Sequence, residues 1–141
     1  MTRKTMTLTA GDIAVGDTFE DVLVTDLKRT QLVMYAGTSG DYNPLHTDDV
    51  YCREAAGYPG VFAHGMLTMG MTGRMLTNYV GDGRLKSYGV RFTSQVWPGD
   101  TLHSTATVDE VNDDVVSLKV ETTNQDGAVV VSGYATARVD T

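Results

Sequence analysis

The segment from Met66 to Val80 is the feature that most restricts how this chain can fold. Its residues are apolar or small on nearly every face of a helix, and they include Gly70 and Gly73. A helix that is apolar all round is a buried helix, and each internal glycine costs about 1 kcal/mol relative to alanine. The segment therefore predicts a buried helix, and its glycines indicate that another backbone approaches closely, as a wrapping sheet would.

The last third of the chain predicts that sheet. β-rich segments occupy residues 85–96, 101–108, 115–123 and 128–139. Turn residues separate them at 98–100, 112–114 and 125–127, and Asp126-Gly127 is a strong hairpin signal. These segments predict an antiparallel meander.

The first half of the chain predicts one short strand and two helices. The strand lies within residues 17–27, one helix runs from Arg29 to a stop at Gly37, and a second begins at Asp48 and Asp49 and ends at Ala56. We interpret the two aspartates as a helix start and nothing more. A strand and helices followed by a meander place the chain in the α+β class.

Composition narrows the classes of partner. The 141 residues predict a single domain, 1–141, whose first ten residues form a flexible N-terminus. The net charge of −7 disfavours nucleic acid and anionic membranes as partners. Cys52 is the single cysteine, which favours a reducing compartment, and no stretch reaches the roughly 20 apolar residues that span a bilayer. We expect a cytoplasmic protein.

A connector rich in turn residues carries the first candidate site. In Tyr35-Ala-Gly-Thr-Ser-Gly-Asp-Tyr-Asn-Pro-Leu-His-Thr-Asp48, Asp41 and His46 stand five positions apart. A carboxylate and an imidazole aimed by one loop suit proton transfer, which needs each group within hydrogen-bond reach of the reacting atom. Asp41 as a plain turn residue and His46 as a plain loop histidine are the alternatives. We interpret Asn43 as a loop organiser.

The second candidate cluster, Ala63-His64-Gly65-Met66, opens the apolar helix. Free N–H groups and the helix dipole favour negative charge at a helix start, and Gly65 leaves its amide open to a ligand. For His64 we expect a structural hydrogen bond.

A metal site is not expected. His46-Thr47-Asp48 with the distant His103 imitates a two-histidine, one-carboxylate iron site. The family with that pattern also places an arginine about ten residues after the distal histidine, where this chain has Val111 to Asp114. A serine hydrolase is equally unsupported, since the chain has no Gly-x-Ser-x-Gly elbow.

The connector motif resembles the hydratase motif of the MaoC-like (R)-specific enoyl-CoA hydratases and 3-hydroxyacyl thioester dehydratases. Ala63-His-Gly-Met-Leu67 looks like the start of their central helix, and Val90-Arg-Phe-Thr93 and Val96-Trp-Pro-Gly-Asp-Thr101 resemble the following strand and turn. The resemblance covers residues 15–139. It implies a hot-dog fold, in which a long helix, here Met66 to Val80, is wrapped by a curved antiparallel sheet, and which usually pairs into a dimer.

The resemblance also implies the chemistry. Asp41 and His46 would be the catalytic pair, the Gly65 N–H would bind the thioester carbonyl, and Asn43 and His64 would support the loop. The expected reaction is reversible hydration of trans-2-enoyl thioesters of CoA or acyl-carrier protein, with no cofactor and no metal. Some relatives carry a serine where this chain has Gly73, which leaves the acyl group open.

Two other functions remain as alternatives. One is a hot-dog acyl thioesterase, which would use a carboxylate and water on a similar fold. The other is a partner subunit that supports a second hot-dog chain in a heterodimer. A homodimer is the expected assembly.

Overall fold

The computed structural model describes residues 8–141, which form one sheet, a long central helix and a group of short helices. The helical elements are a 3₁₀ turn Ala10–Asp12, α1 (Arg29–Ser39), a 3₁₀ turn Pro44–His46, α2 (Asp49–Tyr51), which continues as a π-helical turn Cys52–Ala56, and α3 (Gly65–Val80). The strands are β1 (Thr18–Val24), β2 (Leu85–Phe92), β3 (Leu102–Asn112), β4 (Val115–Thr123) and β5 (Val129–Arg138).

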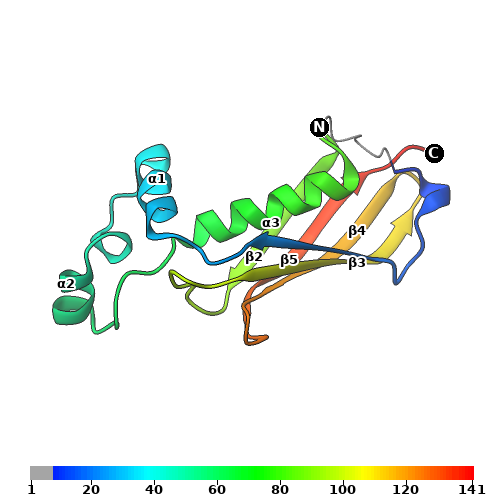
Figure 1. Ribbon diagram of the computed structural model, residues 1–141. Helices are drawn as coiled ribbons and strands as arrows, with labels where there is room; N and C mark the ends of the chain where they lie inside the picture. Colours follow the sequence, from blue (N-terminus) through cyan, green and yellow to red (C-terminus); the bar gives the residue numbers. More distant parts are fainter. Residues whose placement is uncertain (1–7) are drawn as a thin grey trace.

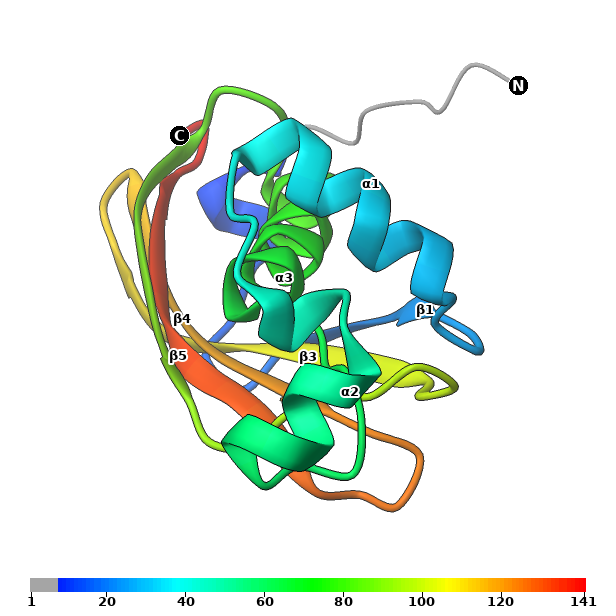
Figure 2. The ribbon, with the colours of Figure 1, turned by 90° about the vertical axis from the view of Figure 1, so that its left-hand side faces the viewer.

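The five strands form a single antiparallel sheet in the order β1-β3-β4-β5-β2. The sheet curves around α3, as Figure 2 shows, while α1 and α2 lie beyond the sheet at the end where α3 begins (Figure 1). This arrangement agrees with the predicted long helix in a curved meander. None of the described helices has the length and apolar character required to cross a bilayer.

The apolar core consists of two clusters along α3. In the α3-start cluster, Leu67 of α3 packs with residues from α1, the π-helical turn, the neighbouring loops and strands β3 and β5. Its buried members are Leu27, Leu32, Cys52, Val61, Ala63, Leu67, Val96, Leu102, Val130 and Val131. The α3-end cluster contains Met75, Leu76 and Val80, packed mainly against β3, β4 and β5. Burial of these side chains contributes about 25 cal/mol per Å² of apolar surface removed from water.

Helix α3 is buried on one side only, which corrects the expectation of burial on every face. Met66 is 57% exposed and Gly70 and Arg74 are also exposed, because the single sheet covers only part of the circumference of the helix. The two glycines also differ from expectation. A Cβ at Gly70 would meet nothing within 4 Å, and one at Gly73 would meet the ring of Tyr88 at 3.2 Å, so a side chain approaches there and no backbone does.

Helix α1 continues past its predicted stop at Gly37 and ends at Ser39. Gly40 is the C-cap, with φ of 76°, and its N–H donates to the Ala36 carbonyl. The left-handed conformation that ends a helix is favourable for glycine, whereas Gly37 has ordinary helical geometry. The predicted stop at Gly37 is therefore wrong, because the sequence does not show which of the two glycines has the left-handed backbone angles.

Several element boundaries also differ from the sequence prediction. β3 extends to Asn112, well past residue 108, and the turn that follows has Asp113 at a positive φ of 54°. β2 ends at Phe92 because residues 93–96 leave the sheet. Within the predicted flexible N-terminus, residues 1–7 lie outside the described residues, but Leu8 is buried and Thr9 forms a bridge with Asp140.

The two glycines of α1 provide a matched test of this account. Gly40→Ala should destabilise the protein by about 1–2 kcal/mol, because alanine is strained in the left-handed region. Gly37→Ala should stabilise it by up to about 1 kcal/mol through helix propensity, since its Cβ would meet nothing within 4 Å. Urea denaturation measures both values, and shifts of the same sign in the two variants would contradict the assignment of the helix end.

Candidate active site

Asp41 is positioned by the end of α1 and by a series of local turns. After Gly40 reverses the chain, the Asp41 N–H donates to the Ser39 hydroxyl at 3.2 Å, and the Asp41 Oδ1 accepts the Asn43 N–H at 3.2 Å. Asn43 in turn caps the 3₁₀ turn that follows, since its Oδ1 accepts the Leu45 N–H at 3.0 Å. These side-chain-to-backbone bonds give the connector one defined path.

His46 closes this 3₁₀ turn and points inward. The residue is only 8% exposed, and its Nδ1 lies 2.7 Å from the Phe62 carbonyl oxygen. A carbonyl only accepts, so Nδ1 carries the proton and Nε2 presents a lone pair when the ring is neutral. The Phe62 ring also meets the imidazole edge to face, with centroids 5.5 Å apart.

His64 contacts both Asp41 and His46. Its ring is stacked on His46, with centroids 3.7 Å apart and an interplanar angle of 22°, and its Nε2–H donates to the Asp41 carbonyl oxygen at 3.1 Å. Tyr35 packs against its edge at 4.8 Å. The ring is 2% exposed, and its burial lowers the pKa of His64, so it is neutral at pH 7.

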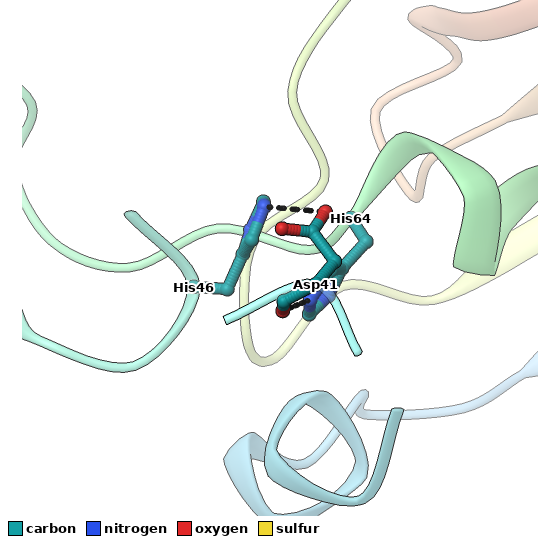
Figure 3. A group of neighbouring side chains, drawn as sticks. All are labelled: Asp41, His46 and His64. Carbon is teal, nitrogen blue, oxygen red and sulfur yellow. Dashed lines mark hydrogen bonds and ion pairs between the residues drawn. The ribbon is translucent and has the colours of Figure 1, made fainter. Parts of the chain in front are cut away.

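The Asp41 and His46 side chains face each other across a short gap. Asp41 Oδ2 lies 3.8 Å from His46 Nε2, and the two groups point toward each other in Figure 3. The separation is longer than a direct hydrogen bond. The carboxylate side chain is 53% exposed and the imidazole side chain 10%, so the gap opens to solvent on the Asp41 side.

Gly65 begins α3 beside this cluster. Among the described residues, no backbone carbonyl accepts the N–H of Gly65 or of Met66, which leaves donors of the kind that bind anions at helix starts. A cavity of about 310 Å³ adjoins Gly65, and the Phe92 ring stands 3.1 Å from the place that a Gly65 Cβ would occupy. A larger hollow, of about 1110 Å³, lies on the outer face of the sheet away from these groups.

Asp49 holds the surrounding segments together, which corrects its interpretation as a helix start only. Its Oδ1 accepts the Val61 N–H at 3.0 Å, and its Oδ2 accepts from the Arg29 guanidinium at 2.7 Å. It thereby ties the start of α1 to the loop that carries Phe62. The Arg29 side chain is the main cause that lowers the pKa of the Asp49 carboxyl.

Phe62 and Tyr35 were not predicted as residues of the site. Phe62 acts through its carbonyl, a group that every residue has, so no sequence signal marks it. Tyr35 was included in the motif, but its contact with His64 depends on how α1 packs.

Asp41, His46 and His64 are also the residues best placed to hold a metal, since their ligand atoms lie within 4.8 Å of one another. Zinc holds its nitrogen ligands at about 2.0–2.1 Å, so their atoms must lie roughly 3.3 Å apart. The lone pair of an imidazole lies in the plane of its ring, so the stacked rings of His46 and His64 would have to turn before both could face one ion. His103 lies elsewhere, on β3, where it faces Glu20 at 3.7 Å.

The sequence matches the MaoC like domain family over residues 2–130. The chain belongs to this family. A relative from Mycobacterium tuberculosis, 3-hydroxyacyl-thioester dehydratase Y, is 43% identical over 67 residues, which cover 45% of this chain and 23% of the relative. The MaoC-like chain spans about a third or less of the length of the curated relatives it matches.

Solved structures agree with this family assignment. The R-hydratase PhaJ1 from Pseudomonas aeruginosa is 27% identical and superposes with a TM-score of 0.84, covering 95% of this chain and 86% of that one. The ChsH1-ChsH2 complex from Mycobacterium tuberculosis, at 24% identity, a TM-score of 0.79 and coverage of 89% and 98%, supports the fold alone. The MaoC-like chain has the hot-dog fold, as predicted.

The ion pair of Asp49 should make stability depend on pH. A carboxyl whose folded pKa is lowered stabilises the protein above its unfolded value, here 3.8, and that stabilisation is lost as the pH falls through the lower folded value. Asp49→Asn should therefore lower the Tm by a few degrees at pH 7, and the difference from wild type should shrink below pH 4. Glu54→Gln, which changes an exposed carboxylate on the same segment, is the control. A pH-independent Asp49→Asn effect would contradict the charge argument.

Proposed function

We propose that this chain catalyses reversible hydration of trans-2-enoyl thioesters to (R)-3-hydroxyacyl thioesters, with Asp41 and His46 as the proton-handling pair. The family and the names of its relatives favour this chemistry. The observation that carries the assignment is that Asp41 Oδ2 faces His46 Nε2 at a distance of 3.8 Å.

Both of these atoms are hydrogen-bond acceptors. His46 Nδ1–H is committed to the Phe62 carbonyl, so the lone pair of Nε2 faces the Asp41 carboxylate across 3.8 Å. Two acceptors at this distance require a donor between or beside them. A water molecule fits this requirement, because it can donate one hydrogen to each atom and keep its oxygen lone pairs free for attack.

This water supplies both the oxygen and the proton that the hydration reaction adds. Its oxygen forms a bond to C3 of the enoyl group while one of its protons passes to the Asp41–His46 pair. The electron pair of the C2–C3 double bond moves toward the thioester carbonyl to form an enolate, and the pair returns a proton to C2. Dehydration is the reverse sequence. Proton transfer by positioned groups typically contributes about 10²–10⁴-fold in rate.

The enolate oxygen needs a donor in place before it forms. The Gly65 N–H supplies one at the start of α3, in the favourable field of the helix dipole. Removal of a comparable donor in other enzymes costs about 2.7–4 kcal/mol in the barrier. His64 and Asn43 hold the geometry: His64 through its bond to Asp41 and its stacking on His46, and Asn43 through its cap of the turn before His46.

CoA or an acyl-carrier protein is the expected thioester handle, and the cytoplasm the expected compartment. The net charge of −7 opposes binding of an acidic carrier protein or of CoA phosphates over the whole surface. Recognition of either handle therefore depends on a local group of basic residues.

Substitutions in the pair provide the direct test. Asp41→Asn and His46→Ala should each reduce kcat for crotonyl-CoA hydration by about 10²–10⁴-fold, because an amide cannot take up the proton of the attacking water and alanine has no ring nitrogen to do so. Asp48→Asn is the matched control, since asparagine is an equally good helix N-cap and Asp48 has no role in the proposed chemistry. Loss of enoyl absorbance measures the rate.

Folded Asp41→Asn and His46→Ala proteins with near wild-type rates would overturn the assignment. Release of free thiol from acyl-CoA without loss of enoyl absorbance would instead identify a thioesterase.

We infer further that the chain forms a homodimer. Among the described strands, β2 lies at the edge of the sheet with no partner on one side, and beside it Met66 and Phe92 are 57% and 52% exposed. Exposed apolar side chains next to an open strand edge are typical of an interface. A second copy, or a related chain in a heterodimer, would cover the side of α3 that the sheet leaves open.

Sedimentation of the protein expressed alone tests this assembly. The wild type should have twice the mass of the chain, and Met66→Glu should shift it toward monomer because a charge is then buried in the interface. Val15→Glu, at another apolar position that is 66% exposed, should leave the mass unchanged. A monomeric wild type that becomes active only with a related chain added would replace the homodimer with a heterodimer.

A further inference from the structure

The cavity beside Gly65 lies between the first turn of α3, strands β2 and β5, and the loop that follows β2. On the helix it is lined by Gly65 and Thr68, and opposite them by Phe92 from β2 and Val130 and Val131 from β5. The α3, β2 and β5 walls are apolar apart from Thr68, while the loop after β2 adds the polar residues Thr93, Ser94 and Gln95. The cavity begins at the amide proposed to bind the thioester carbonyl, so it is the space available to the acyl group.

A set of buried hydroxyl groups lies next to the residues that line the cavity, although none of these groups lines the cavity itself. Thr72 follows Thr68 by one turn on the same face of α3. On the sheet, Thr122 of β4 is the direct cross-strand neighbour of Val131. Both threonines are buried. One lining residue on the helix and one on the sheet are therefore each next to one of these two threonines.

Thr72, Thr122 and Ser104 form a continuous hydroxyl chain across the core. The Thr72 and Thr122 oxygens are 2.8 Å apart, Thr122 donates to Ser104 at 2.9 Å, and Ser104 donates to the Glu121 carbonyl at 3.3 Å. Since Thr122 donates to Ser104, Thr72 must donate to Thr122, and every proton has an acceptor. The hydroxyl chain is therefore a fixed polar layer, and opening it would leave buried groups unpaired at a cost.

This polar layer coincides with the boundary between the two apolar clusters. Leu67 of α3 belongs to the α3-start cluster and Met75 to the α3-end cluster, with Thr72 between them. A longer acyl group bound at Gly65 would extend past the α3-start cluster and then meet hydroxyl groups that are already bonded to one another. Penetration would break those bonds without replacing them.

Tyr88 of β2 packs against the part of α3 that carries Thr72. Its ring stands 3.2 Å from the place of a Gly73 Cβ, and its hydroxyl donates to the Met69 carbonyl at 2.8 Å. Gly73 lacks a side chain that would cover this carbonyl, which explains how the phenol reaches it. Burial raises the pKa of Tyr88 to about 12, so the phenol keeps its proton and its bond at every working pH.

We propose that the hydroxyl chain and Tyr88 together close the inner end of the acyl cavity, so that this enzyme selects short-chain enoyl thioesters, and that Tyr88 sets the length limit. This inference rests on the proposed hydratase function. Tyr88 is here a specificity residue and takes no part in proton transfer. Its ring is the largest group at the closed end and the one whose removal creates space beside Gly73.

A chain-length series tests the proposal, with kcat/KM measured for crotonyl-, hexenoyl-, octenoyl- and dodecenoyl-CoA. The wild type should prefer crotonyl-CoA over octenoyl-CoA by at least about tenfold, the range that a poorly accommodated methylene group produces. Tyr88→Ala should reduce that preference by about tenfold. Tyr79→Ala, which removes a ring of equal size from α3 where it stacks on Phe19 at 4.8 Å, should leave the preference unchanged.

Tyr88→Val provides a second variant should the alanine protein fail to fold, because a β-branched residue suits a strand. Inhibition of crotonyl-CoA hydration by octanoyl-CoA gives an independent measure, and it should strengthen in the Tyr88 variants. A wild type that hydrates all four substrates equally well, or a folded Tyr88 variant with the wild-type preference, would overturn the proposal. Absence of hydration with every substrate would instead reject the proposed function.

Discussion

The contact between His64 and the connector that carries Asp41 and His46 is the interaction on which the geometry of the site depends. His64 bonds the Asp41 backbone and stacks on the His46 ring, and it is covalently joined to Gly65 at the start of α3. One side chain thus relates both proposed proton handlers to the proposed carbonyl-binding amide. Its Nδ1 is buried without a partner among the described residues, a cost of about 1–3 kcal/mol. A ring kept at such a cost is better explained by positioning than by stability.

The elements predicted best from the sequence are those whose own residues determine them. The run from Met66 to Val80 differs from α3 only by beginning one residue late, and the segment 115–123 coincides with β4. Asp126-Gly127 forms a turn, with Gly127 at φ of 78°. In each case local hydrophobic period and turn chemistry agree with the tertiary environment, which is the condition under which sequence alone is informative.

The features that escaped prediction depend on contacts between distant segments. Nothing near Asp49 in the sequence indicates that its carboxylate will bond Arg29 and the Val61 amide, and Phe62 orients His46 through an atom common to all residues. The exposed side of α3 is a similar case. An apolar helix reads as buried on every face, but how much of it this chain's own sheet covers depends on the curvature of that sheet and on assembly.

Three parts of helix α3 have different roles, and the residue types change accordingly along the helix. The first turn presents free N–H groups, the last two turns supply Met75, Leu76 and Val80 to the core, and inward positions between them hold Thr68 and Thr72. Aliphatic residues at those two positions would satisfy the pattern of a buried helix better. Departures from the pattern that best stabilises a fold are expected where a site must be shaped. The proposed end of the acyl cavity partway along α3 therefore accounts for threonine at these two positions.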